Sequence, residues 1–318
     1  MSISVFLRRG IALVLAVLIP IASSAWESEG HRFINRAAAE SIPSDMPPFF
    51  KSASAWIAFL GPEPDQWRET VEPSLKNAQE PEHFIDLEDL QGFPPLPRKR
   101  FDFYRLAYAK RAAANIPADN PKWLPERIGL QPWITAEVFE RLKVAFREYR
   151  ALKAAGKSTF PAEQDAIFYA GWLGHYVGDG SQPMHASIHH HGWVGDNPHG
   201  YSTNSRIHSE FEGRFVRENI KREDFQPLVH APRHLDDPWA DYMAYLEHSN
   251  SLIEKTYQLE KAGAFTGAGT AEGREFVKER LAAASQMLLD LWYTAWIDSG
   301  TPLPVRRGPA PAAPPATQ

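Results

Sequence analysis

The sequence contains no cysteine. This absence excludes a disulfide framework and thiolate metal ligands, so any bound metal must be held by histidine, carboxylate or main-chain atoms. Basic residues are also in the minority, because 34 Lys and Arg stand against 39 Asp and Glu, for a formal net charge of −5. A chain with this charge is not a general binder of nucleic acid, unless metal ions supply positive charge locally.

Long apolar runs are scarce, and the one that stands out lies at the start of the chain. An arginine pair at positions 8 and 9 precedes an apolar run over 11–21, which is followed by Ala-Ser-Ser-Ala ending at Ala25. This order is typical of a secretory signal peptide, and the run is shorter than the ~20 residues of a membrane span. We therefore expect residues 1–25 to be a signal peptide, with cleavage before Trp26 and a secreted or periplasmic mature protein that has no transmembrane span.

Alternating strand patterns are also missing, and most of the chain reads as amphipathic helix. The helical periodicity is clearest over 134–155, 162–179, 205–220, 240–261 and 272–298. With 43% hydrophobic residues the chain can bury a sizeable core. The sequence predicts an all-α fold with one domain over 26–301 and a Pro- and Ala-rich disordered tail over 302–318.

Two helical segments carry histidine–carboxylate pairs with a spacing of four residues. His175 precedes Asp179 and His208 precedes Glu212, so each pair shares one helix face, and His185 follows six residues after Asp179. Imidazole and carboxylate at this spacing can bind a metal ion. One such pair alone is more often an ion pair or a capped core histidine, but two pairs with a further histidine favour a metal site.

The expected mature N-terminus adds further donors. A free amine on Trp26, together with the carbonyl of the same residue, could chelate a metal, since an α-amino group has an ordinary pKa near ~7.7. His31 follows five residues later. Asp65, with Arg68 three residues on, and His83 are further candidates, although Asp65 could equally be a helix N-cap and His83 a core histidine.

Taken together, these motifs resemble the superfamily that unites bacterial zinc-dependent phospholipases C with fungal-type single-strand-specific nucleases. The resemblance runs from Trp26 to Glu212 in the order Trp-x4-His, Asp-x-x-Arg, His-Phe-Ile-Asp, His-x3-Asp-x5-His and His-x3-Glu. It implies an all-α domain that holds three Zn²⁺ ions in a cleft and hydrolyses phosphoesters by zinc-activated water. No stable protein partner is implied.

The resemblance also implies roles for individual residues. Asp65 would orient or deprotonate the attacking water, and Arg68 would contact phosphate unless it forms a surface salt bridge. Asp86 would orient His83. The implied metal ligands are Asp65, His83, His175 and Asp179 at one ion, Asp179, Trp26 and His31 at a second, and His185, His208 and Glu212 at a third.

The substrate is less closely determined by the motifs. The spacing Trp26-x4-His31 and the strings beginning at Asp65 and His83 are nuclease-like, whereas Glu212 and Gln182-Pro-Met-His-Ala are phospholipase-like. We predict a nuclease for single-stranded DNA or RNA, or a 3′-nucleotidase. A phospholipase C acting on phosphatidylcholine-like headgroups is the alternative, and a non-catalytic zinc-binding envelope protein is a third.

The loop over 188–201 bears on this choice. The nuclease branch usually has Gly-Gly-Asn here, contacting the nucleobase, whereas this chain has three consecutive histidines followed by Trp193 and Tyr201. The two aromatic residues could stack on a base, form a cage for choline, or simply anchor the loop.

Overall fold

The computed structural model describes residues 26–302, and within this range the chain forms helices and no β-strand. The predicted all-α class is therefore confirmed. The predicted signal peptide and all of the predicted tail beyond residue 302 lie outside the described residues. Among the described helices, none is both long and apolar enough to cross a membrane.

Fifteen α-helices are joined by short tight-turn segments over the described range. Of the segments designated η, η4 is a single π-helical turn and the others are 3-10 helices. In chain order the elements are α1 (Glu27–Glu40), α2 (Pro48–Ser52), α3 (Ser54–Leu60), α4 (Glu63–Glu69), α5 (Pro73–Gln79), η1 (Glu80–His83), η2 (Leu87–Leu90), α6 (Arg100–Ala113), α7 (Pro125–Ile128), α8 (Gln131–Ala154), α9 (Phe160–Ser181), η3 (Pro183–Ala186), α10 (Arg206–Ser209), η4 (Glu210–Arg214), α11 (Phe215–Asn219), α12 (Arg222–Phe225), η5 (Gln226–Leu228), α13 (Pro238–Ser251), α14 (Ile253–Lys261) and α15 (Ala271–Asp298).

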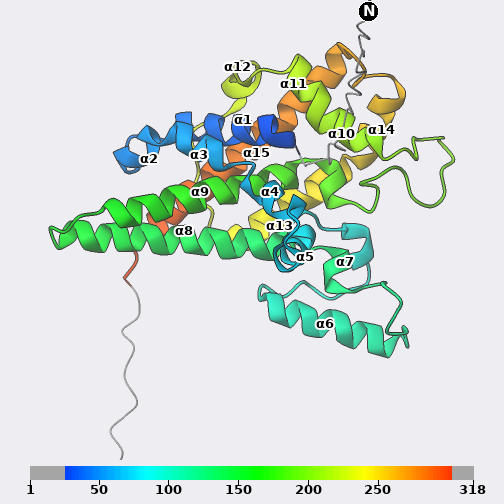
Figure 1. Cartoon of the computed structure of the whole chain (residues 1–318), viewed down its shortest axis with the longest axis horizontal. Coiled ribbons are helices and arrows are strands. Elements are labelled where there is room, and N and C mark those ends of the chain that lie inside the picture. The colour runs from blue at the N-terminus through cyan, green and yellow to red at the C-terminus, as the bar shows by residue number, and fades with distance from the viewer. Residues whose placement is uncertain (1–25, 303–318) are drawn as a thin grey trace, which may run out of the picture.

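Three long helices build the core. Figure 1 shows α8 and α9 running side by side along the long axis of the molecule, and α15 packs against both of them and against α1. Aromatic side chains fill the space between these helices. Phe50 from α2 lies edge-on to Phe146 of α8 and to Trp292 of α15, with ring centroids 5.2 Å apart in each pair. Burial of such apolar surface is the main driving force for this packing.

Helix α1 approaches α9 closely because glycines face it. A Cβ at Gly174 would lie 1.8 Å from Asn35 Oδ1, and one at Gly178 would lie 2.9 Å from His31 Nδ1. Asn35 also donates hydrogen bonds to the carbonyls of Ile57 and Gly171, at 2.9 and 3.0 Å. The two helices can therefore place His31 beside the His175 and Asp179 side chains of α9.

Two of the predicted helices are interrupted. The helix expected over 205–220 is divided into α10, the wider turn η4 and α11, and the helix expected over 240–261 ends at Ser251 and restarts as α14. At the second break the Leu252 amide bonds to the Ser249 carbonyl, which tightens the last turn of α13. Apolar periodicity continues across both interruptions, so it could not reveal them.

Candidate metal centre

The predicted metal ligands converge from elements that are far apart in the sequence, and all of them are buried. Groups whose donor atoms lie close enough to share one ion are His31, His175 and Asp179; Asp65, His83 and His175; and His185, His208 and Glu212.

Asp179 belongs to the first group and also lies close to two members of the second, His83 and His175. Its Oδ2 is 3.2 Å from His83 Nδ1 and 3.4 Å from His175 Nε2, while its Oδ1 is 3.3 Å from His31 Nε2. The His31 ring is stacked on that of His175 at 3.9 Å. One carboxylate thus faces imidazoles on both sides, which is the arrangement that a ligand bridging two ions requires.

Asp65 joins this group from α4. Its Oδ1 lies 3.8 Å from both His83 Nδ1 and His175 Nε2, and it accepts a 2.8 Å hydrogen bond from Arg68 Nη2. Asp65 lies within α4 rather than at its N-cap. The Arg68 side chain is only 19% exposed, so its ion pair belongs to the centre and is not the surface salt bridge considered above.

The remaining group forms around the π-helical turn. His185 Nε2 and His208 Nε2 are 2.9 Å apart, and the Glu212 carboxylate lies 3.6 and 2.9 Å from them, respectively. Such turns are frequent at functional sites because they redirect a side chain within a helix. Here η4 contains Glu212, while His208 comes from the preceding α10.

Main-chain carbonyls fix the orientation of three of the histidines. In each case Nδ1 donates its hydrogen to a carbonyl, so Nε2 is left as a lone pair that faces the other donors. The pairs are His175 with Gly61 at 2.9 Å, His185 with His83 at 2.7 Å, and His208 with His190 at 2.7 Å. Lone pairs that face one another at 2.9 Å need a cation between them.

The buried carboxylates lead to the same conclusion. Asp65 Oδ2 and Asp179 Oδ1 have no hydrogen-bond partner among the described residues. Burial raises the pKa of both carboxyl groups to about 7, against the lowering effect of Arg68 on each. Burial likewise holds the pKa of His83 and His175 well below its usual value. A neutral imidazole and a carboxylate are the ligands that zinc takes, so these residues fit zinc and a divalent cation would satisfy them.

Trp26 is anchored beside this centre by its side chain. Its indole N–H lies 2.8 Å from the Gly178 carbonyl and 3.1 Å from Ser181 Oγ, and donates to both. Its backbone has a left-handed conformation, with φ of 37°. The predicted ligand atoms are its amine and carbonyl. The amine exists only after cleavage before Trp26, so this ligand stays a prediction.

The expected link between Asp86 and His83 is wrong. Asp86 Oδ1 lies 3.6 Å from His190 Nδ1 instead, at the residue that immediately precedes η2. A supporting residue that the sequence analysis missed is Gln182, whose side-chain amide donates a 2.8 Å hydrogen bond to Glu212 Oε2. The sequence signal for it was the phospholipase-like string Gln182-Pro-Met-His-Ala, which gave no indication of a contact with Glu212.

The histidine-rich loop is held by its aromatic residues. The Trp193 ring stacks on His189 at 4.0 Å, and its indole N–H donates to the Asp196 carbonyl. Tyr201 is buried, and its hydroxyl donates to Glu254. Trp193 and Tyr201 are therefore loop anchors, and neither lines the cleft described next.

A cleft of 1050 Å³ opens over the centre. Its walls combine cations with carboxylates and include His83, His185 and His208 from the centre, and also His190, His191 and Phe84. The charged lining residues are Arg68, Lys76, Arg127, Glu69, Glu80, Asp119 and Glu126.

Comparison with known proteins leaves the family open. No family model matches the chain. A probable serine protease of Bradyrhizobium tropiciagri is 26% identical over 171 residues, which cover 43% of this chain and 21% of that protein. Among solved structures, alpha toxins of Clostridium absonum and Clostridium perfringens align over 87% of this chain and 64% of theirs. Both are 12% identical, with TM-scores of 0.43 and 0.40. The chain thus spans about a fifth of the first relative and less than two thirds of either toxin.

Proposed function

We propose that this protein is an exported zinc-dependent phosphodiesterase whose substrate is a phospholipid headgroup, as in a phospholipase C. The observation that carries the choice of substrate is the mixed charge of the cleft. Three cationic side chains and four carboxylates line it. This lining suits a zwitterion such as phosphocholine, whose ammonium and phosphate groups need opposite charges, better than it suits a polyanionic strand.

The residues of the centre divide the chemistry between them. Bound zinc would lower the pKa of a water molecule to near ~7 and neutralise charge on the phosphate. Asp65 can orient an attacking water through Oδ2, because its Oδ1 is already engaged by Arg68. Arg68 lines the cleft, so its guanidinium group can contact a phosphate oxygen of a bound substrate.

A single-strand nuclease is the second candidate. It is favoured by Phe84, which lines the cleft and has its ring 5.9 Å from that of His190. A base could stack on this ring. The cleft would then have to admit a polyanion past Glu69, Glu80 and Glu126, so we rank this function second.

Initial rates on two substrates test the proposal. Protein beginning at Trp26 is loaded with zinc and assayed on short-chain phosphatidylcholine, kept monomeric below its micelle concentration, and on single-stranded DNA, each with and without chelator. We expect chelator-sensitive turnover of the lipid. Chelator-sensitive cleavage of DNA alone would replace the proposal with the nuclease. Bound zinc with no turnover of either substrate would favour the non-catalytic alternative.

A further inference from the structure

The corner between α4 and α5 carries exposed aliphatic side chains at the edge of the cleft. We define this α4–α5 corner as residues 68–77. Val71 is 91% exposed and Leu75 is 39% exposed, and every residue from 71 to 77 is solvent-exposed. Single exposed apolar residues are common on protein surfaces. These two are distinguished by their position beside the candidate catalytic centre.

The corner and the cleft are parts of one structure. Arg68 and Glu69 on one side of the turn, and Lys76 and Asn77 on the other, line the cleft, while Val71 lies between them. Helices α4 and α5 pack against each other, and Glu126 and Arg127 of α7 line the same cleft. Whatever surface contacts Val71 and Leu75 is therefore brought to the mouth of the cleft.

We propose that the α4–α5 corner docks on the surface of a zwitterionic phospholipid bilayer and so presents headgroups to the cleft. This inference rests on the proposed function. Aliphatic side chains enter the boundary between headgroups and acyl chains, and the charged groups beside them remain at the headgroup level. The corner exposes both signs of charge, with the cation Lys76 near the carboxylates Glu69 and Glu72. This mixture complements the phosphate and the ammonium of a phosphatidylcholine layer rather than a uniformly anionic partner.

The test compares the double variant V71E/L75E with the control V144E. Val144 is also an exposed valine, 56% exposed, but it lies on α8 and does not line the cleft. Each zinc-loaded protein is assayed for co-sedimentation with phosphatidylcholine vesicles, and for turnover of vesicle lipid and of the monomeric short-chain lipid. Circular dichroism checks that the variants are folded.

The expected result is selective. The double variant should bind vesicles and hydrolyse vesicle lipid at least about tenfold more weakly, since its two aliphatic side chains no longer enter the bilayer. Its turnover of monomeric lipid should stay within about twofold of wild type, and V144E should match wild type throughout.

Other results would overturn the docking proposal or separate it from the proposed function. Unchanged vesicle binding and vesicle turnover in the double variant would overturn it. A change of oligomeric state in size-exclusion chromatography would overturn it in favour of self-association through the corner. If wild type binds vesicles through the corner but hydrolyses no lipid, docking stands and the proposed function fails. If wild type hydrolyses monomeric lipid but does not bind vesicles, the reverse holds.

Discussion

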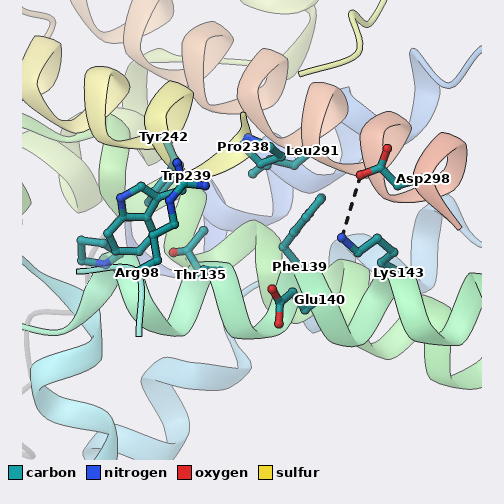
Figure 2. Close-up of a pocket in the computed structure, with 12 residues that line it drawn as sticks. Arg98, Thr135, Phe139, Glu140, Lys143, Pro238, Trp239, Tyr242, Leu291 and Asp298 are labelled. Carbon is teal, nitrogen blue, oxygen red and sulfur yellow. Dashed lines mark ion pairs between the residues drawn. The ribbon is translucent and has the colours of Figure 1, made fainter. Parts of the chain in front are cut away.

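Two hollows in this molecule are lined by both charged and apolar residues but differ in how the charged and polar groups are paired. The smaller one, shown in Figure 2, has a volume of 220 Å³ and lies between α8, α13 and α15. Both of its cationic groups already have partners, because Arg98 bonds to Asp237 at 2.5 Å and Lys143 lies 3.9 Å from Asp298. The Phe139 side chain lies between the two groups of charged residues that line this hollow.

The larger hollow is the cleft over the metal centre, where imidazole and carboxylate lone pairs converge on one another. His185 and His208 approach through their Nε2 atoms, and Asp179 is flanked by three imidazoles. A cavity with completed ion pairs gains little from a charged ligand, whereas converging lone pairs and buried carboxylates gain a great deal from a cation. The candidate site is therefore identified by polar groups that lack a complementary partner among the described residues, and not by the number of polar groups.

The strongest test of this contrast replaces one carboxylate by its amide at each place, Asp65 in the metal centre and Asp298 in the smaller hollow. Asp65→Asn should lower the rate on the preferred phosphodiester more than about a hundredfold, because loss of a direct ligand exceeds the ~10–100-fold cost typical of supporting residues. Asp298→Asn should leave the rate unchanged. Steady-state kinetics of both zinc-loaded variants provide the measurement, and full activity in Asp65→Asn would contradict the role given to this residue.

Removal of metal should change stability as well as activity. Zinc at roughly 100 times its Kd stabilises a folded protein by about 2.7 kcal/mol, provided that it binds the native state alone. We therefore expect chelator to lower Tm and added zinc to restore it, as measured by differential scanning calorimetry. The shift should be smaller in His208→Ala and unchanged in Asp298→Asn. An identical Tm with and without chelator would mean that the buried groups are satisfied without a metal.

The fold class could be predicted because helical periodicity depends on local sequence. The apolar positions of α8, α9 and α15 recur every three to four residues, and each of these helices forms close to its expected bounds. The short helices α2 to α5 gave no such signal. They begin at prolines or follow one another closely. Packing against α9 holds α2, α3 and α4 in place, and α5 packs against α4 and η1.

The spacing of residues in the sequence predicted the ligands of the centre, but it could not predict contacts between residues that are far apart in the chain. The pairs His175 and Asp179, and His208 and Glu212, meet because each lies within one turn of chain. The contact of Asp86 with His190 joins residues about a hundred positions apart, so no local pattern contains it. The same holds for Gln182 and Glu212, which are brought together by the return of the chain through η4.

Gln182 therefore offers a subtler test of the centre. Gln182→Met removes the amide that bonds to Glu212 while keeping a side chain of similar length. Zinc affinity, measured by competition with a chelating dye, should fall about 10–100-fold, as for other supporting residues. The matched control is Gln131→Met, because Gln131 is equally buried but donates to the Tyr176 carbonyl, away from the lone pairs of the centre. That control should lower stability and leave zinc affinity unchanged, and equal losses of affinity in both variants would indicate a general packing effect.

The smallest expected effect is a pH-dependent change in stability at Asp298, which lines the smaller hollow. A 2.9 Å hydrogen bond to Asp298 is the main cause that raises the pKa of His234, with Asp236 also contributing. A raised pKa in the folded protein means that this pair stabilises it below the ordinary histidine pKa of about 6.5, and that the contribution is lost as pH rises through the raised value. Because His234 is partly exposed, Asp298→Asn should lower the free energy of unfolding by no more than about 1 kcal/mol near pH 5.5, and by less near pH 8.5. Urea denaturation at the two pH values measures this difference. A loss that does not change with pH would assign the stabilisation to Lys143, which lies 3.9 Å from Asp298, instead of to His234.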